Sequence, residues 1–264
     1  MFSVKNYVKA KSLEEAYELN QKKTSVVLGG TVWLKMGSRQ IQTAIDLSDL
    51  QLDKIEETEE EFSIGAMVSL RQLEIHQGLH EYFNGALKEA TRHIVGVQFR
   101  NCATVGGSVY GRFGFSDILT CLLAMDSYVE LFKGGIVPLK DFIDMPYDRD
   151  ILVRVIIKKD NRQVVYLSHR NTATDFPVLA CAVAKTDKKV VTSIGARPAR
   201  ATLVEDVNGL VKDINSEEDR NAFGTFVKET IFFGSNMRGS KEYRQHLAGV
   251  LVNRGLSRLA EKDN

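Results

Sequence analysis

Two glycine-bearing turns are the features of this 264-residue sequence that could do chemistry. Residues 26–33 read VVLGGTVW, and residues 104–108 read TVGGS. Because glycine has no Cβ and tolerates positive φ, such turns let the main chain approach a ligand closely. Their successive N–H groups suit a phosphate. With the neighbouring hydroxyls of Thr31 and Thr104, the two turns predict a site for the pyrophosphate of a dinucleotide.

Each turn taken alone has a second interpretation, because a glycine pair that follows a strand is often only a turn. Neither turn fits G-x-G-x-x-G or G-x-x-x-x-G-K-[ST], so the sequence does not predict a Rossmann or P-loop site. The residues by themselves leave both interpretations open.

Composition excludes several classes of partner. Lysine and arginine total 35 against 34 acidic residues, which gives no basic surface for nucleic acid or an anionic membrane. No apolar run approaches the roughly 20 residues that span a bilayer, and the N-terminus lacks the features of a targeting signal, so we expect a cytoplasmic protein. Cys102, Cys121 and Cys181 lie far apart and lack the C-x-x-C spacing of zinc or iron–sulfur ligation, so neither kind of site is expected.

No metal ligands or catalytic residues are expected in this chain. His76 and His80 have the i, i+4 spacing of a metal-binding pair, but no third ligand lies near them in the sequence. An exposed histidine pair is the better interpretation. No arrangement of serine, histidine and aspartate, or of cysteine and histidine, predicts a nucleophile.

Hydrophobic periodicity predicts the elements that position the turns. A short βαβ unit opens the chain, with Ser12 as the helix N-cap and a small parallel sheet. A helical stretch is expected over about 70–95, and further helices are expected to begin at about 117, to end at Ala184 and to begin at about 216. Strands are expected at 62–67, 128–132, 151–158 and 190–195. The pattern predicts an α+β protein with a domain boundary near residue 160.

Several stretches, in this order, carry a family resemblance: VVLGGTVWLKM, AIDLSDL, FSIGAMVSLRQLE, QFRNCATVGGSVYGRFGFSDILTCLLAMDSYVEL, DILVRVIIK, SIGARPARAT and MRGSKEYRQHLAGVLV. With them the chain resembles the FAD-binding medium subunit of the molybdenum hydroxylases, the xanthine dehydrogenase and carbon monoxide dehydrogenase family. The resemblance implies a PCMH-type (vanillyl-alcohol-oxidase-like) FAD-binding domain over 1–160, with subdomains of about 1–55 and 56–160. A smaller α+β C-terminal domain follows over 161–264.

The resemblance also implies which residues bind FAD. The expected set comprises both turns and a few later positions: Val26, Val27, Leu28, Gly29, Gly30, Thr31, Val32, Trp33, Thr104, Val105, Gly106, Gly107, Ser108, Gly111, Ser116, Asp117, Leu152 and Phe176. Asp117 is expected on sugar or ribityl hydroxyls, or as the N-cap of its helix. Leu152 and Phe176 are expected near the flavin ring or as ordinary core residues, with Phe176 on a helical face. For Trp33 a core position is favoured, and Phe113 is open between core and flavin.

As a member of such a family, the chain would relay electrons and leave substrate oxidation to another subunit. The implied partners are a molybdopterin-binding large subunit and a 2Fe–2S small subunit in a heterotrimer, with NAD+ or another electron acceptor. A purine or other N-heterocycle is the first expectation for the substrate of the complex. Two alternatives stay open: a free-standing flavoprotein reductase or oxidase of the same fold, and an assembly subunit that has lost FAD.

Overall fold

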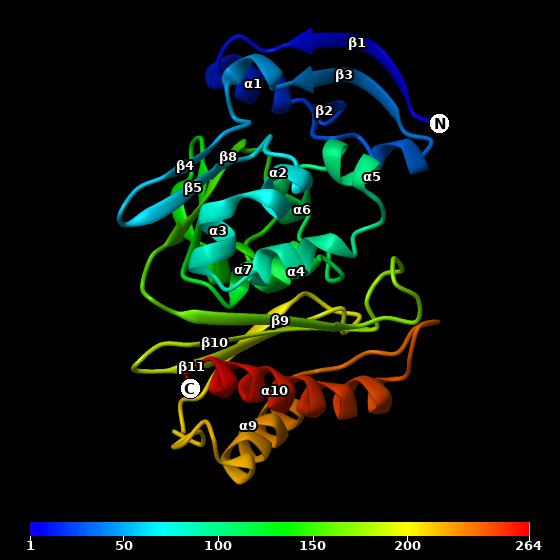
Figure 1. Ribbon diagram of the computed structural model, residues 1–264. Helices are drawn as coiled ribbons and strands as arrows, with labels where there is room; N and C mark the ends of the chain where they lie inside the picture. Colours follow the sequence, from blue (N-terminus) through cyan, green and yellow to red (C-terminus); the bar gives the residue numbers. More distant parts are fainter. Residues whose placement is uncertain (264) are drawn as a thin grey trace. The chain divides into compact units, whose positions relative to one another are not determined.

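The computed structural model describes residues 1–263, and its internal contacts divide the chain into two compact units (Figure 1). Unit 1 comprises Met1–Leu73, Val97–Gly111 and Ser127–Ile157. Unit 2 comprises Glu74–Gly96, Arg112–Asp126 and the chain from Lys158 onward. The units are therefore interleaved along the sequence, whereas the predicted domains 1–160 and 161–264 are consecutive. The domain boundaries 1–160 and 161–264 remain a prediction.

The N-terminal part of unit 1 is the small parallel sheet that the sequence predicts. Strands β1 (Ser3–Lys9), β3 (Gln40–Asp46) and β2 (Ser25–Leu28) lie in the order β1-β3-β2, and both pairings are parallel. Helix α1 (Leu13–Asn20) begins after Ser12, whose hydroxyl accepts a hydrogen bond from the Glu15 amide at 3.2 Å. This N-cap confirms the prediction. Apolar side chains of the central strand and of α1 share one core cluster, which includes Ala16 and Ile45.

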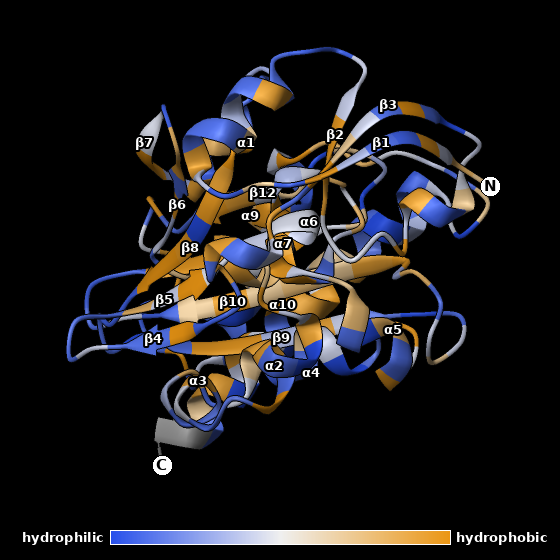
Figure 2. Ribbon diagram, turned by 90° about the horizontal axis from the view of Figure 1, so that it is seen from above, coloured by the Kyte–Doolittle hydropathy of each residue, from blue (hydrophilic) through white to orange (hydrophobic). Residues whose placement is uncertain are grey.

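A second sheet completes unit 1. Its strand order is β4-β5-β8-β6-β7, formed by β4 (Ile55–Glu57), β5 (Glu61–Gly65), β8 (Leu152–Lys158), β6 (Ser127–Leu131) and β7 (Gly135–Pro138). The central strand β8 is mostly hydrophobic, as its orange colour in Figure 2 shows. Short helices in this unit are η1 (Leu34–Met36), η2 (Ser48–Leu50), α5 (Val97–Cys102), α6 (Val105–Tyr110) and α8 (Leu139–Phe142), and α2 (Leu70–Ile75) begins here.

Unit 2 is an antiparallel sheet with helices on both faces. The strand order is β12-β11-β10-β9, formed by β12 (Thr202–Glu205), β11 (Val190–Gly195), β10 (Leu179–Lys185) and β9 (Gln163–His169). Helices α9 (Glu217–Thr230) and α10 (Lys241–Asp263) share an apolar core with one face. Helices α4 (Ala86–Arg92) and α7 (Asp117–Leu123) contact the other face, and α3 (Gln77–Tyr82) packs on α4.

One prediction of secondary structure is confirmed in outline and one is wrong. The helical stretch expected over about 70–95 consists of three helices, because His76 caps α3 through its Nδ1 and residues 84 and 85 adopt left-handed φ of 53° and 76°. The helix expected through Ala184 is strand β10. Helices cover both faces of this strand, so its sequence LACAVAK is apolar at successive positions and lacks the alternation of a half-exposed strand. The mixed α/β class and the helical C-terminal tail are confirmed.

Candidate functional site

The first glycine turn follows β2 and offers main-chain donors. Thr31 adopts a left-handed φ of 58°, a conformation that a β-branched residue rarely takes. Within the described chain, the amides of residues 29–32 donate no hydrogen bond to another residue. Buried or half-buried amides normally have a partner. The turn thus presents unused N–H groups at the end of a strand, as an anion-binding turn does.

In the second glycine turn, the amides of residues 105–108 are already hydrogen-bonded. Thr104 caps α6, and its Oγ1 accepts a hydrogen bond from the Gly107 amide at 3.1 Å. The amides of Val105, Gly106 and Ser108 donate to the carbonyls of Val68, Ala66 and Thr104 at 2.8, 2.8 and 3.1 Å. The expectation of two equivalent amide nests is therefore corrected. The amides of 105–108 stabilise the turn itself, because it forms the first turn of a short helix.

The two turns lie against each other. A Cβ on Gly30 would lie 1.6 Å from the Cys102 carbonyl oxygen, and one on Gly29 would lie 2.8 Å from Thr104 Oγ1. A Cβ on Gly106 would meet the Ala66 carbonyl oxygen at 2.6 Å, whereas Gly107 has only Thr104 Oγ1 near it, at 3.2 Å. Gly30 and Gly106 are thus required for main-chain packing. Gly107 has no such packing role.

A cavity of about 320 Å³ opens where the turns meet, entirely within unit 1. Half of the expected cofactor residues line it: Val26, Val27, Leu28, Gly29, Thr104, Gly106, Gly107, Gly111 and Leu152. Gly30, Thr31, Val32, Trp33, Val105 and Ser108 belong to the same turns and are not part of the lining. Trp33 is half exposed, at 50%, so the expectation of a core position for it is wrong.

Charged residues that sequence reasoning missed also line the cavity. Arg149 donates to the carbonyls of Lys22 at 2.7 Å and Ser25 at 2.9 Å, and so holds the turn that precedes β2. Asp150 accepts hydrogen bonds from the amides of Lys133 and Gly134. In contrast, the exposed Arg39 side chain makes no hydrogen bond or ion pair with the described chain. The contacts of Arg149 span more than 100 residues, those of Asp150 span 16 and 17 residues, and Arg39 has none among the described residues, so no local motif could have predicted these roles.

Three expected cofactor residues belong to unit 2, where Asp117 is the centre of a buried network. Ser116 is the N-cap of α7 and accepts from the Leu119 amide at 3.1 Å, so the interpretation of Asp117 as the cap is wrong. Asp117 is 5% exposed, and its Oδ1 accepts from Arg170 at 2.5 Å and from the Tyr166 hydroxyl. Burial raises the pKa of Asp117 to about 6, against the opposing charge of Arg170.

Phe176 lies in a loop of unit 2, and the helical face expected around it is absent from this part of the structure. Its ring contacts Phe115 edge-on with centroids 4.5 Å apart, and Phe115 stacks on Phe113 at 5.2 Å. Phe113 is 40% exposed. Sequence reasoning did not single out Phe115, because only the fold brings the loop at 112–116 to Phe176.

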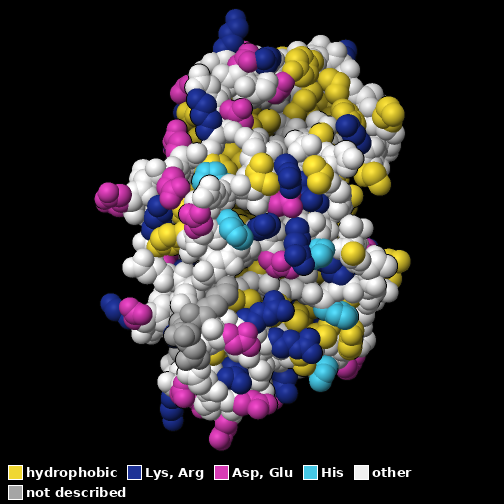
Figure 3. All heavy atoms as spheres, viewed as in Figure 1, with side chains coloured by type: hydrophobic (Ala, Val, Ile, Leu, Met, Phe, Trp, Pro, Cys, Tyr) yellow, Lys and Arg dark blue, Asp and Glu magenta, His cyan; other side chains and the backbone are white. Residues whose placement is uncertain are grey.

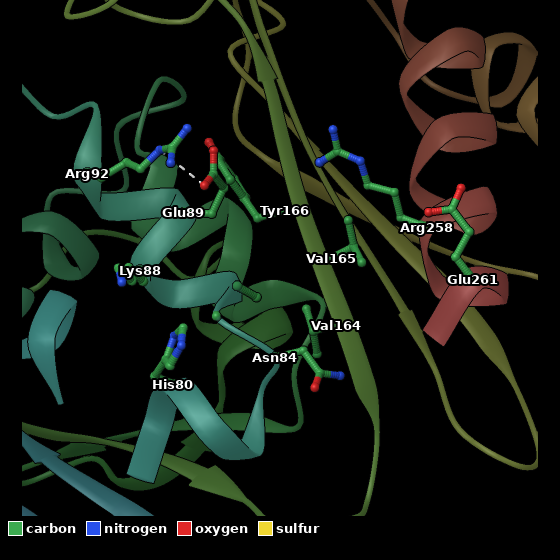
Figure 4. Close-up of a pocket in the computed structure, with 12 residues that line it drawn as sticks. His80, Asn84, Lys88, Glu89, Arg92, Val164, Val165, Tyr166, Arg258 and Glu261 are labelled. Atoms are coloured by element: carbon green, nitrogen blue, oxygen red, sulfur yellow. Dashed lines mark ion pairs between the residues drawn. The ribbon is translucent and has the colours of Figure 1, made fainter. Parts of the chain in front are cut away.

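A second cleft, of about 460 Å³, lies in unit 2 along strand β9 (Figure 4). Side chains of α3 and α4 border it on one side and side chains of α10 on the other. Of the charged residues that line it, Lys88, Glu89 and Arg92 belong to α4, and Arg258 and Glu261 belong to α10. Arg92 pairs with Glu89 at 3.1 Å. Its charges are of both signs, as they are over the face of the molecule shown in Figure 3. The cleft therefore does not select one class of ligand.

No metal centre is found among residues 1–263, and two of the three cysteines are buried. No group of three histidine, cysteine, aspartate or glutamate side chains could hold a metal ion within this range. Burial raises the pKa of the Cys181 thiol to about 12 and that of Cys121 still further. The helices of the described chain are also too short or too polar to cross a membrane.

Comparison with known proteins gives consistent matches. Residues 2–159 match the model of the FAD binding domain in molybdopterin dehydrogenase. The chain is 28% identical over 258 residues to the uncharacterized protein YgfM of Escherichia coli K12, which covers 94% of each chain. It is 23% identical over 278 residues to the glyceraldehyde dehydrogenase medium chain of Sulfolobus acidocaldarius, covering 97% of this chain and 98% of that one. The crystal structure of quinoline 2-oxidoreductase from Pseudomonas putida 86 has a TM-score of 0.87 at 17% identity over 98% of both chains, a match of fold.

Proposed function

Because the chain belongs to the family of FAD-binding domains in molybdopterin dehydrogenases, we propose that it is the electron-transfer subunit of a molybdenum hydroxylase. The chain is an oxidoreductase flavoprotein subunit with FAD as its cofactor. In the proposed complex, a large subunit with molybdopterin oxidises the substrate, a purine or another N-heterocycle. A small subunit with 2Fe–2S clusters delivers electrons to this chain, and NAD+ or another acceptor receives them. The medium-chain name of the Sulfolobus relative supports the division into subunits.

The single observation that carries this proposal is the cavity between the glycine turns, with unused amides on one turn and bare glycine on the other. Residues 29–32 would donate hydrogen bonds to the FAD diphosphate. Gly107 would let the second turn approach it, because a side chain there would project into the space. The exposed cation Arg39 adds positive charge at the cavity without being neutralised by an acid. The residues present fit a dinucleotide diphosphate.

FAD, when bound, supplies the exchange of single electrons and electron pairs that links iron–sulfur clusters to a two-electron acceptor. The chain's own residues bind and orient it. The hydrogen bonds of Arg149 fix the main chain before β2, and those of the Thr104 cap fix the second turn. Both turns are therefore preorganised, which lowers the entropic cost of binding.

The experiment is the replacement of Gly107 by valine. Since the nearest atom to the new Cβ is the Thr104 hydroxyl, the protein is expected to fold and to purify without its flavin absorption band. Gly37→Val is the matched control, because a Cβ at Gly37 meets only the Leu34 carbonyl at 3.6 Å, outside the cavity. Flavin content is measured per polypeptide, and folding by thermal unfolding. A folded Gly107→Val protein with full flavin content would show that the cofactor lies elsewhere.

Purification of the native protein also distinguishes the proposed function from that of a free-standing flavoprotein. The native protein is expected to copurify with a molybdenum-containing chain and an iron–sulfur chain. A yellow protein that purifies alone from its natural source, free of molybdenum and iron, would favour the free-standing reductase or oxidase instead.

A further inference from the structure

Four charged side chains line the cavity between the glycine turns, and two of them are already committed to the fold. Arg149 donates to main-chain carbonyls of residues 20–25, and Asp150 accepts from main-chain amides. The other two, Arg39 and Asp148, are exposed. Their charges are opposite, yet within the described chain they form no ion pair with each other or with another residue.

Asp148 is held in place through one of its two carboxylate oxygens. Its Oδ1 accepts a hydrogen bond from the Tyr110 hydroxyl at 2.8 Å and from the Asp150 amide at 3.1 Å. Its Oδ2 accepts no hydrogen bond from any residue of 1–263. Because an ionised carboxylate has about four acceptor sites on two oxygens, Asp148 keeps acceptor capacity for a ligand in the cavity.

Tyr110 holds this carboxylate close to the second glycine turn. Gly107 and Tyr110 both belong to α6 and both line the cavity. Residues three apart lie on the same side of a helix. The side chain that binds Asp148 therefore projects from the same side of α6 as Gly107, where the second turn is proposed to approach the diphosphate.

The chemistry of a carboxylate decides which part of FAD it can bind. A carboxylate repels a diphosphate, and it accepts hydrogen bonds from hydroxyl groups. In FAD the diphosphate is flanked by the ribose of adenosine and by the ribityl chain, and both carry hydroxyls. Acidic side chains bind ribose hydroxyls in other dinucleotide sites. Arg39 and Asp148 thus suit two neighbouring parts of one ligand, the diphosphate and a sugar.

The acid that the family resemblance assigns to the sugar hydroxyls is committed elsewhere. Asp117 is 5% exposed, and its Oδ1 accepts from Arg170 at 2.5 Å and from the Tyr166 hydroxyl. A ligand would have to compete with these buried donors. Asp148 is exposed and lines the cavity, so a ligand can reach its Oδ2 without breaking a hydrogen bond of the fold.

We infer that Asp148 binds a sugar hydroxyl of FAD through Oδ2, while Tyr110 and the Asp150 amide hold it through Oδ1. This inference rests on the proposed function, because it adds one contact to the same FAD site. The hydroxyl belongs to the ribose or to the ribityl chain, and competing ligands distinguish the two.

The test is the titration of FAD-free, full-length Asp148→Asn protein with FAD. Asparagine keeps one oxygen for Tyr110 and the Asp150 amide, and it replaces Oδ2 with an amide nitrogen that cannot accept. The dissociation constant for FAD is expected to rise by about tenfold or more, because a hydrogen bond to a charged group is lost. A carboxylate that only repelled the diphosphate would give the opposite sign, since its removal would tighten binding.

The matched control is Asp53→Asn, at an exposed acid of unit 1 that does not line the cavity. Its dissociation constant for FAD should equal that of the wild type. Thermal unfolding of both FAD-free variants should also match the wild type, which shows that an effect of Asp148→Asn on FAD binding is not a loss of folding.

Competition with FAD by ADP and by riboflavin 5′-phosphate identifies the sugar. If Asp148 binds the ribose, Asp148→Asn should lose affinity for ADP alone; if it binds the ribityl chain, the variant should lose affinity for riboflavin 5′-phosphate alone. An ADP effect should vanish with 2′,3′-dideoxy-ADP, which has no ribose hydroxyl at these positions. A loss that persists with this analogue would place Asp148 on the adenine and overturn the inference.

The outcomes separate this contact from the proposed function. If the wild type binds FAD and Asp148→Asn binds it equally well or more tightly, the inference is wrong and the proposed function stands. If the wild type neither carries flavin nor binds added FAD, the proposed function fails and the inference fails with it.

Discussion

The cavity of unit 1 and the Asp117 network of unit 2 use polar groups in opposite ways. In the network, a buried carboxylate, a guanidinium and a phenol hydroxyl satisfy one another within the fold. At the cavity, the amides of residues 29–32 and the Arg39 side chain have no partner in the described chain. Leaving donors unused has a free-energy cost, so such groups are typical of a place where a ligand supplies the acceptor. Changes in the network should therefore alter stability, and changes at the cavity should alter FAD affinity.

Asp117→Ala is the change with the largest expected effect. It leaves two donors without their acceptor, and one of them is the charged Arg170, whose side chain is 7% exposed. Removing one partner of a buried ion pair costs about 3–5 kcal/mol in the free energy of unfolding. Asp117→Asn is the matched control, because both donors bind Oδ1 and an amide oxygen can accept from both. Equal destabilisation by alanine and asparagine in denaturant titrations would show that the network does not depend on this acceptor.

The pH dependence of stability is the next largest effect. Asp117 has a pKa of about 6 in the folded protein and an ordinary value of 3.8, so between these values the folded state binds more protons than the unfolded chain. The contribution of this carboxyl to stability is therefore greatest at low pH and decreases as the pH rises from about 4 to 6, by about 3 kcal/mol. The measurement is the difference in unfolding free energy between wild type and Asp117→Asn across this range. A difference that does not change with pH would mean that Asp117 titrates normally.

The comparison also shows what the sequence could predict. Both glycine turns were identified from their residues, since a strand followed by a glycine pair has a local signature. The hydrogen-bond partners of their amides were not predictable, because those of 105–107 depend on Thr104, Ala66 and Val68 in the folded chain. Likewise, Tyr166 and Arg170 reach Asp117 across 49 and 53 residues. Local patterns located the candidate site, and tertiary contacts decide which groups in it are available.

Arg39→Glu should change the affinity for FAD and leave the stability unchanged, whereas Asp117→Ala should change the stability. The side chain is exposed and has no partner in the described structure, so the free energy of unfolding without FAD should hardly change. The dissociation constant for FAD should rise by about tenfold at low salt, because attraction to the diphosphate becomes repulsion. The rise should shrink at high salt. Titration of FAD-free protein measures it, with Lys5→Glu on the exposed strand β1 as the charge-matched control. Equal effects of the two variants would place the diphosphate away from Arg39.

Thr31→Gly has the smallest expected effect and tests the first turn itself. The left-handed φ of 58° strains threonine but not glycine, while glycine also gives the unfolded chain more freedom. Relief of strain in the folded state should exceed the gain in freedom of the unfolded chain, so the FAD-free protein should be stabilised by about 1 kcal/mol or less. Denaturant titration measures this difference. Since Thr31 does not line the cavity, flavin content should be unchanged if the turn binds through its amides alone. A loss of flavin from a stabilised Thr31→Gly protein would show that the hydroxyl also contacts the cofactor. The first turn would then bind through both side chain and main chain.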